Sequence, residues 1–251
     1  MQTLLLETKG PVAWVWLNQS RRLNAIDITT LTELRETFEA LGQDTTRAIV
    51  LAAHGPVFSA GFDVSWMARQ DAEAVARELA DVEAVYDTIE ACSKPVIAAI
   101  QGPAMGGGLL LALVADFRLA SEEASFGAPE VKIGIFPNLG LIPRLERIVG
   151  VGAAKHMVLT GDPVTAAEAS RIGLVEQVLP PETLHSKAQS LAEQLAALPA
   201  HAVQVAKGAF AAAQGTDFVS WERAKFVACW ARPEREAAMQ AFLQMRTDRQ
   251  P

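Results

Sequence analysis

The chain has 251 residues, of which 50% are hydrophobic and 20% charged, with 29 acidic against 22 basic side chains. This much apolar material excludes a disordered chain and is enough for a core that needs no cross-links. The formal charge of −7 and the lack of a Lys/Arg-rich run exclude nucleic acid or an anionic membrane as the main partner. The length fits one large domain with an appendage.

Cysteine usage and the N-terminal residues indicate a reducing compartment. Cys92 and Cys229 are too few for a disulfide framework, and neither they nor the four histidines have metal-ligand spacing. Residues 1–7 do not form a secretory signal, because no basic region precedes a long apolar stretch. The longest apolar run, 106–115, is about half of a membrane span. We therefore expect a cytoplasmic protein with no metal site and no membrane segment.

The first half of the chain alternates short apolar strands with amphipathic helices. The expected strands span residues 4–8, 12–17, 48–53, 95–100 and 116–120. The expected helices span residues 29–41 and 71–90, and a third, apolar helix is expected to follow Gly106-Gly107-Gly108 and to end at about residue 115. The helix at 71–90 is expected to place one apolar face against the core, formed by Val75, Leu79, Val82, Tyr86 and Ile89. This order of elements predicts an α/β fold.

The last third of the chain is Ala-rich and predominantly helical. From about residue 153 we expect helices, among them 184–198, 201–214 and 221–245, with one short strand at 174–178. We therefore expect residues 1–195 to form an α/β core. Residues 196–251 are expected to form a helical segment that packs on the core or on a neighbouring subunit.

Two glycine-containing segments follow buried strands, at residues 58–63 and 102–108. Backbone N–H groups at such turns and at helix N-termini can stabilise an anion, and two converging sources would form an oxyanion hole. On the residues alone, ordinary turns and close helix–sheet packing are the favoured interpretation of these glycines.

Glu130 stands out among the acidic residues because apolar residues and a proline surround it, in the sequence Phe126-Gly127-Ala128-Pro129-Glu130-Val131. A carboxylate desolvated by such neighbours has a raised pKa and can act as a general base. From the residues alone, a surface glutamate that starts a helix after Pro129 is the favoured alternative.

Several segments, in chain order, resemble the motifs of one enzyme family. They are Asn18-Gln19-Ser20-Arg21-Arg22-Leu23-Asn24-Ala25, Phe58-Ser59-Ala60-Gly61-Phe62-Asp63-Val64, Lys94–Gly102, Gly106-Gly107-Gly108, Leu159–Asp162, Ala166–Ala169 and Gly173-Leu174-Val175. Together they resemble the crotonase superfamily, the enoyl-CoA hydratase/isomerase family. Each motif alone is weak, but their order along most of the chain is specific. Gln19 and Ser20 depart from the family's Asn-Arg-Pro element.

The resemblance implies a spiral of repeated β-β-α units followed by a helical C-terminal segment. It also implies that the N–H groups of Phe62 and Gly107 form an oxyanion hole for the thioester carbonyl of an acyl-CoA, with Glu130 as the catalytic acid–base. CoA is then part of the substrate, and no separate cofactor is implied. The residues implied to contact the substrate or CoA are Ala60, Asp63, Val64, Ser65, Gly106, Leu110 and Asn138.

One departure concerns the reaction itself. Hydratases of the family carry two catalytic glutamates, and Leu110 occupies the position of the first, whereas Glu130 retains the second. One carboxylate is enough to move a proton from the α to the γ carbon, as in the Δ3,Δ2-enoyl-CoA isomerases that this pattern resembles. We therefore expect a double-bond shift. The alternatives are a hydratase in which Asn138 or a backbone group compensates, and a non-catalytic acyl-CoA-binding protein.

The C-terminal segment 241–246 resembles the family's closing helix, with Met245 where a CoA-binding lysine often stands. Arg246 or Arg249 would then replace that lysine. The family's C-terminal segment builds trimers, often paired into hexamers. The resemblance therefore implies a homotrimer or a dimer of trimers, and no nucleic-acid or membrane partner.

Overall fold

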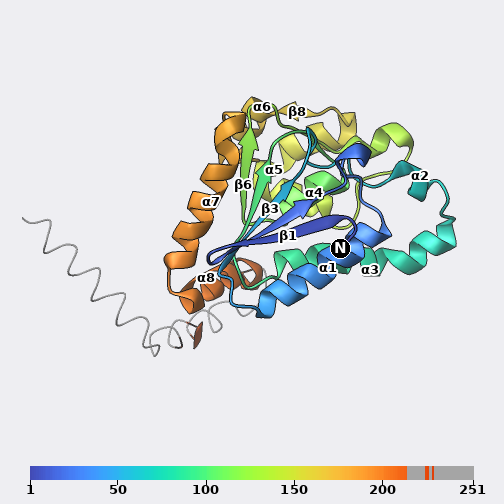
Figure 1. The fold of residues 1–251 in the computed structure, drawn as a ribbon. Coiled ribbons are helices and arrows are strands. Elements are labelled where there is room, and N and C mark those ends of the chain that lie inside the picture. The colour runs from blue at the N-terminus through green and yellow to red at the C-terminus, as the bar shows by residue number, and fades with distance from the viewer. Residues whose placement is uncertain (214–223, 226–227, 229–251) are drawn as a thin grey trace, which may run out of the picture.

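The computed structural model describes residues 1–213, 224–225 and 228 (Figure 1). The expected helix at 221–245, Cys229 and the segment 241–246 therefore lie outside the described residues, apart from the three positions just named. No helix within the described part is long and apolar enough to cross a membrane.

The main sheet has six strands in the order β1-β2-β3-β4-β6-β9. Its strands are β1 (Leu4–Lys9), β2 (Val12–Leu17), β3 (Ala48–Ala53), β4 (Val96–Ile100), β6 (Phe117–Ser121) and β9 (Gln177–Leu179). The β1–β2 hairpin is antiparallel and the other pairs are parallel. The first five strands confirm the prediction. The strand expected at 174–178 begins only at Gln177, because Leu174 and Val175 pack into the core before it.

A second, three-stranded sheet was not predicted. It consists of β5 (Ala104–Met105), β7 (Ser125–Gly127) and β8 (Val164–Thr165). Strands of two or three residues carry no readable alternation of apolar and polar residues, so only tertiary pairing reveals them.

The helices cover both faces of the main sheet. They are α1 (Ile28–Gln43), α2 (Val64–Met67), α3 (Ala72–Glu90), α4 (Gly107–Leu113), α5 (Leu141–Thr160), α6 (Ala166–Arg171), α7 (Pro181–Ala197) and α8 (Ala200–Ala212). Two 3₁₀ turns are added, η1 (Ser20–Arg22) and η2 (Pro129–Ile133). The α/β prediction is thus confirmed, although α5 begins well before the expected residue 153. Gly150 interrupts its helical dihedrals with φ 76°, which hides its first half from a periodicity argument.

Alternate residues of each strand face two separate cores. In β2, Val12, Trp14 and Trp16 pack toward α7, whereas Val15 and Leu17 belong to the core shared with α1, α3 and α4. This explains why the strands read as continuous apolar runs. Figure 1 shows α7 lying along one side of the sheet. The domain boundary expected after residue 195 falls in the last turn of this helix.

The predicted apolar face of α3 is correct for three of its five residues. Val82, Tyr86 and Ile89 are buried, but Val75 and Leu79 are exposed. The N-terminal part of α3 extends beyond the strands toward α2 (Figure 1), so its apolar residues meet no sheet. The buried C-terminal half is the part that approaches the site described next.

Candidate functional site

Three backbone segments lie side by side beyond the ends of β2, β3 and β4. Ser59 and Ala104 form a parallel bridge, in which the Ser59 N–H donates to the Pro103 carbonyl at 3.1 Å and the Met105 N–H donates to the Ser59 carbonyl at 2.9 Å. Ile26 forms a second parallel bridge with Phe62. The two glycine-containing segments of the sequence are therefore neighbours in space.

Gly61 brings the first glycine segment into contact with the second. It has φ 86°, and a Cβ atom there would lie 2.6 Å from the Met105 carbonyl oxygen and 3.3 Å from the Gly107 nitrogen. A residue with a side chain would force these two segments apart. The Phe62 peptide, which follows Gly61, is thus held next to the first turn of α4.

Two backbone donors remain free at this junction. Within the described part of the chain, neither the Phe62 N–H nor the Gly107 N–H donates to an acceptor, whereas the Gly106 N–H donates to the Gly127 carbonyl at 2.9 Å. Gly107 is the first residue of α4, where the helix itself offers no acceptor. Two unpaired N–H groups from adjacent segments are what an oxyanion hole requires.

The Glu130 carboxyl lies against the same turn. Gly106 has φ 52° and ψ −117°, and a Cβ atom on it would be 2.8 Å from Oε1 of Glu130. Oε2 of Glu130 is buried and has no hydrogen-bond partner among the described residues. Burial raises the pKa of Glu130 above its ordinary value of 4.5. The carboxyl group therefore faces the turn rather than bulk solvent and has the character of a base.

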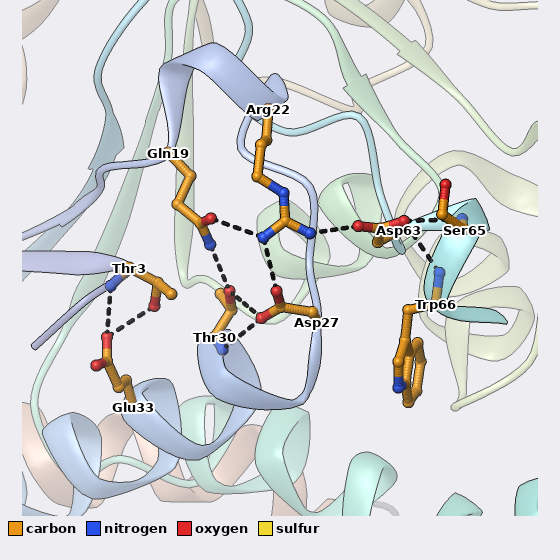
Figure 2. Close-up of polar contacts among 9 residues, drawn as sticks. All are labelled: Thr3, Gln19, Arg22, Asp27, Thr30, Glu33, Asp63, Ser65 and Trp66. Atoms are coloured by element: carbon orange, nitrogen blue, oxygen red, sulfur yellow. Dashed lines mark hydrogen bonds and ion pairs between the residues drawn. The ribbon is translucent and has the colours of Figure 1, made fainter. Parts of the chain in front are cut away.

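The residues after Phe62 are fixed by charged partners (Figure 2). Oδ1 of Asp63 accepts hydrogen bonds from the backbone N–H groups of Ser65 at 2.8 Å and Trp66 at 3.1 Å, which caps α2. Arg22 binds Asp63 and also reaches Asp27 at 2.8 Å. The Trp66 N–H and the Arg22 guanidinium hold the pKa of Asp63 below its ordinary range.

Arg22 is a residue whose role the sequence did not reveal. It stands within the first family-like motif, but only the fold shows that it joins residues 20–27 to the loop that carries Phe62. Gln19, which departs from the family pattern, accepts a hydrogen bond from Arg22 at 2.9 Å. The only signal for this role in the sequence was that Arg22 is a charged residue within that motif.

The structure places the other predicted contacts at different depths. Ala60, Val64 and Ser65 are exposed, whereas Leu110 is only 1% exposed and lies in the core. The Asn138 side chain is exposed, and among the described residues it makes no hydrogen bond to the Glu130 carboxyl group. The substrate contacts assigned to these residues therefore stay predictions.

Comparison with known proteins identifies the family of the chain. Residues 7–249 match the enoyl-CoA hydratase/isomerase family model. The chain is 36% identical to a crotonyl-CoA hydratase of Syntrophomonas wolfei over 98% of this chain and 96% of that protein. It is also 36% identical to an enoyl-CoA isomerase/hydratase of Mycosarcoma maydis, over 80% of this chain and 74% of that protein.

Solved structures of enoyl-CoA hydratases have a similar fold. A crystal structure of an enoyl-CoA hydratase from Bacillus anthracis superposes with a TM-score of 0.93 at 33% identity, covering 97% of each chain. The expected spiral α/β fold is thereby confirmed. The chain belongs to the enoyl-CoA hydratase/isomerase family of enzymes and has the crotonase fold.

Proposed function

We propose that this enzyme shifts the double bond of an enoyl-CoA from the 3,4 to the 2,3 position. The thioester oxygen binds the N–H groups of Phe62 and Gly107, and Glu130 carries the proton. The observation that carries this proposal is the Glu130 carboxyl group, whose Oε1 lies against Gly106 next to the free Gly107 N–H and whose Oε2 is buried without a partner among the described residues. No second carboxylate is needed for this reaction.

The proposed reaction has two proton transfers. Glu130 removes a proton from the carbon next to the thioester carbonyl, and the electron pair moves onto the carbonyl oxygen to give a dienolate. The two N–H groups stabilise that negative charge, for which each donor is worth roughly 3 kcal/mol. Glu130 then returns the proton to the γ carbon, the electrons move back, and the new double bond is conjugated with the thioester.

Leu110 supports isomerisation over hydration. It occupies the position where family hydratases carry their first glutamate, and its apolar side chain is buried among core residues. An apolar group can neither orient water nor transfer a proton. Water that attacks the β carbon would then be positioned by Glu130 alone.

Hydration is the second candidate, because a relative covering nearly the whole chain is named a crotonyl-CoA hydratase. The two reactions are separated by incubating the enzyme with a 3-enoyl-CoA and a 2-enoyl-CoA and resolving the products by chromatography. We expect conversion of the first to the 2-enoyl-CoA to be at least tenfold faster than hydration of the second. Faster hydration would favour the second candidate.

The proposal also includes where CoA binds. The exposed residues Ala60, Val64 and Ser65 and the capping residue Asp63 form one continuous stretch beside the oxyanion hole. We propose that this stretch contacts the CoA part of the substrate. We propose that residues 196–251 build a trimer or a dimer of trimers, which light scattering of the purified enzyme tests.

Asp63→Ala is expected to raise KM for acyl-CoA severalfold and to leave kcat nearly unchanged. It removes the cap that orders residues 63–66, at a cost of about 1 kcal/mol in the free energy of unfolding. Asp27→Ala is the matched control, because Asp27 caps α1 and also binds Arg22. It should lose similar stability in urea unfolding without the change in KM. Equal KM values for both variants would contradict the proposed CoA contact.

The raised pKa of Glu130 predicts how stability depends on pH. Because burial favours the protonated carboxyl, the wild type loses stability as pH rises from 4.5 through the raised pKa. Glu130→Gln has no such charge, so thermal unfolding should show it more stable than the wild type at pH 7. The difference should vanish near pH 4. A variant less stable than the wild type at pH 7 would show that the carboxylate is not desolvated.

A further inference from the structure

Tyr86 is the only tyrosine in the chain and is fully buried in the C-terminal half of α3. Its side chain touches both segments of the proposed oxyanion hole. The hydroxyl group lies 3.1 Å from the position that a Cβ atom on Gly107 would take, and it donates to the Gly107 carbonyl at 3.5 Å. The ring packs edge-to-face against Phe62, with centroids 6.5 Å apart and an angle of 71°.

We propose that Tyr86 is a positioning residue for the oxyanion hole, which sets the Gly107 backbone relative to Phe62. This inference rests on the proposed function, since it concerns the two N–H groups assigned to the thioester oxygen. Tyr86 is fully buried in this structure and acts through Gly107 and Phe62. It is thus not a catalytic residue itself.

The space around Gly107 explains why a long side chain from α3 is needed here. A Cβ atom on Gly107 would lie only 2.9 Å from the Phe62 ring, so Gly107 itself has no room for a side chain. The Tyr86 hydroxyl fills the adjacent space and supplies a polar contact to the backbone. Rotation of the first turn of α4 would break that contact and move the Gly107 N–H.

The Tyr86 hydroxyl is neutral throughout the working pH range. Burial and, to a lesser degree, the nearby charge of Glu130 raise the pKa of Tyr86 far above its ordinary value of 10. The hydroxyl therefore always carries the proton that it donates to Gly107. The hydroxyl lies against Gly107 and Oε1 of Glu130 lies against Gly106, so the two groups flank neighbouring residues of the same turn.

The turn of α3 that carries Tyr86 is itself braced. Arg144 of α5 binds the carboxylates of Asp87 at 2.6 Å and Glu90 at 2.8 Å, and it donates to the Leu139 carbonyl at 3.0 Å. The residue next to Tyr86 is thus tied to the helix that follows the Glu130 segment. This bracing makes Tyr86 a rigid support for the two loops.

Tyr86→Phe removes the hydroxyl and keeps the ring. The loss of one hydrogen bond predicts a three- to tenfold lower kcat, with KM unchanged, because the contact acts on the oxyanion hole rather than on CoA binding. Val85→Ala is the matched control. Val85 is the preceding residue of the same helix and is 3% exposed, so its truncation destabilises α3 while leaving the Tyr86 hydroxyl in place.

The decisive readout is binding that depends on the carbonyl oxygen. Calorimetry gives the affinities of each variant for two ligands. A 3-ketoacyl-CoA can bind as its enolate, whereas an S-alkyl-CoA thioether lacks the thioester carbonyl. The ultraviolet spectrum of the bound enolate gives a second measure. We expect Tyr86→Phe to lower the ratio of the two affinities three- to tenfold and to leave thioether binding unchanged. Val85→Ala should lower the melting temperature and leave the ratio unchanged.

The two affinities distinguish a failure of the proposed oxyanion hole from a failure of the role proposed for Tyr86. If the wild type binds both ligands equally, the oxyanion hole itself is wrong and the proposed function fails. If the wild type prefers the 3-ketoacyl-CoA and Tyr86→Phe keeps the full preference, Tyr86 has only a structural role and this inference is overturned, while the oxyanion hole stands.

Discussion

Glu130→Gln is expected to lower kcat for double-bond migration by about 10²- to 10⁴-fold, the usual contribution of a positioned acid–base group. The amide is close in shape to the carboxyl group, so KM should change little. A spectrophotometric assay with a 3-enoyl-CoA, which gains conjugation on reaction, measures the loss directly.

The control for this variant is Glu122→Gln, which makes the same chemical change at an exposed position in the turn after β6. It should retain the full rate. Undiminished isomerisation by Glu130→Gln would remove Glu130 from the proposed role, whatever its surroundings in the fold.

Gly106→Ala should lower turnover by about 10²-fold or more. Gly106 has a positive φ that side-chain-bearing residues rarely adopt, and the added methyl group would lie 2.8 Å from Oε1 of Glu130. The variant therefore displaces the base and the adjacent Gly107 N–H together, and small displacements of reacting groups cost about this much. Initial rates per mole of folded enzyme, with the folded fraction measured by circular dichroism, test the expectation.

Gly10→Ala is the control, because it adds backbone strain without the collision that an alanine at Gly106 would have with Glu130. Gly10 also has a positive φ, 60°, but a Cβ atom there would meet nothing within 4 Å, and the residue lies in the β1–β2 turn. Both variants should lose stability, whereas only Gly106→Ala should lose activity. A fully active Gly106→Ala enzyme would contradict the position assigned to Glu130.

The sequence predicted the elements in which apolar residues recur at a regular spacing, or which a capping or turn residue bounds. The buried strand at 48–53 was predicted at its observed bounds. The helix predicted at 71–90 is observed at Ala72–Glu90, directly after the capping residue Asp71. The half of α3 that carries Val75 and Leu79 was predicted as buried and is exposed, because periodicity does not show where the sheet beneath a helix ends. The second sheet was missed because its strands are two or three residues long.

The site could be predicted only through the family resemblance. Spacing along the chain does not show that Gly61 lies against Met105 and Gly107, since that contact depends on the Ser59–Ala104 bridge. Nothing in the helical pattern of α3 distinguishes Tyr86 from its apolar neighbours as a contact of Gly107. Such contacts arise from tertiary packing, which a single sequence does not report.

In the proposed mechanism two main-chain donors hold the thioester oxygen while one carboxylate faces the reacting carbons. A crystal structure with a bound 3-ketoacyl-CoA would show the positions of all three groups at once. We predict the thioester oxygen within about 3 Å of both the Phe62 and the Gly107 nitrogen, with Glu130 beside the carbon between the two carbonyl groups. A thioester oxygen bound by neither nitrogen, or a Glu130 carboxyl directed away from that carbon, would contradict the account.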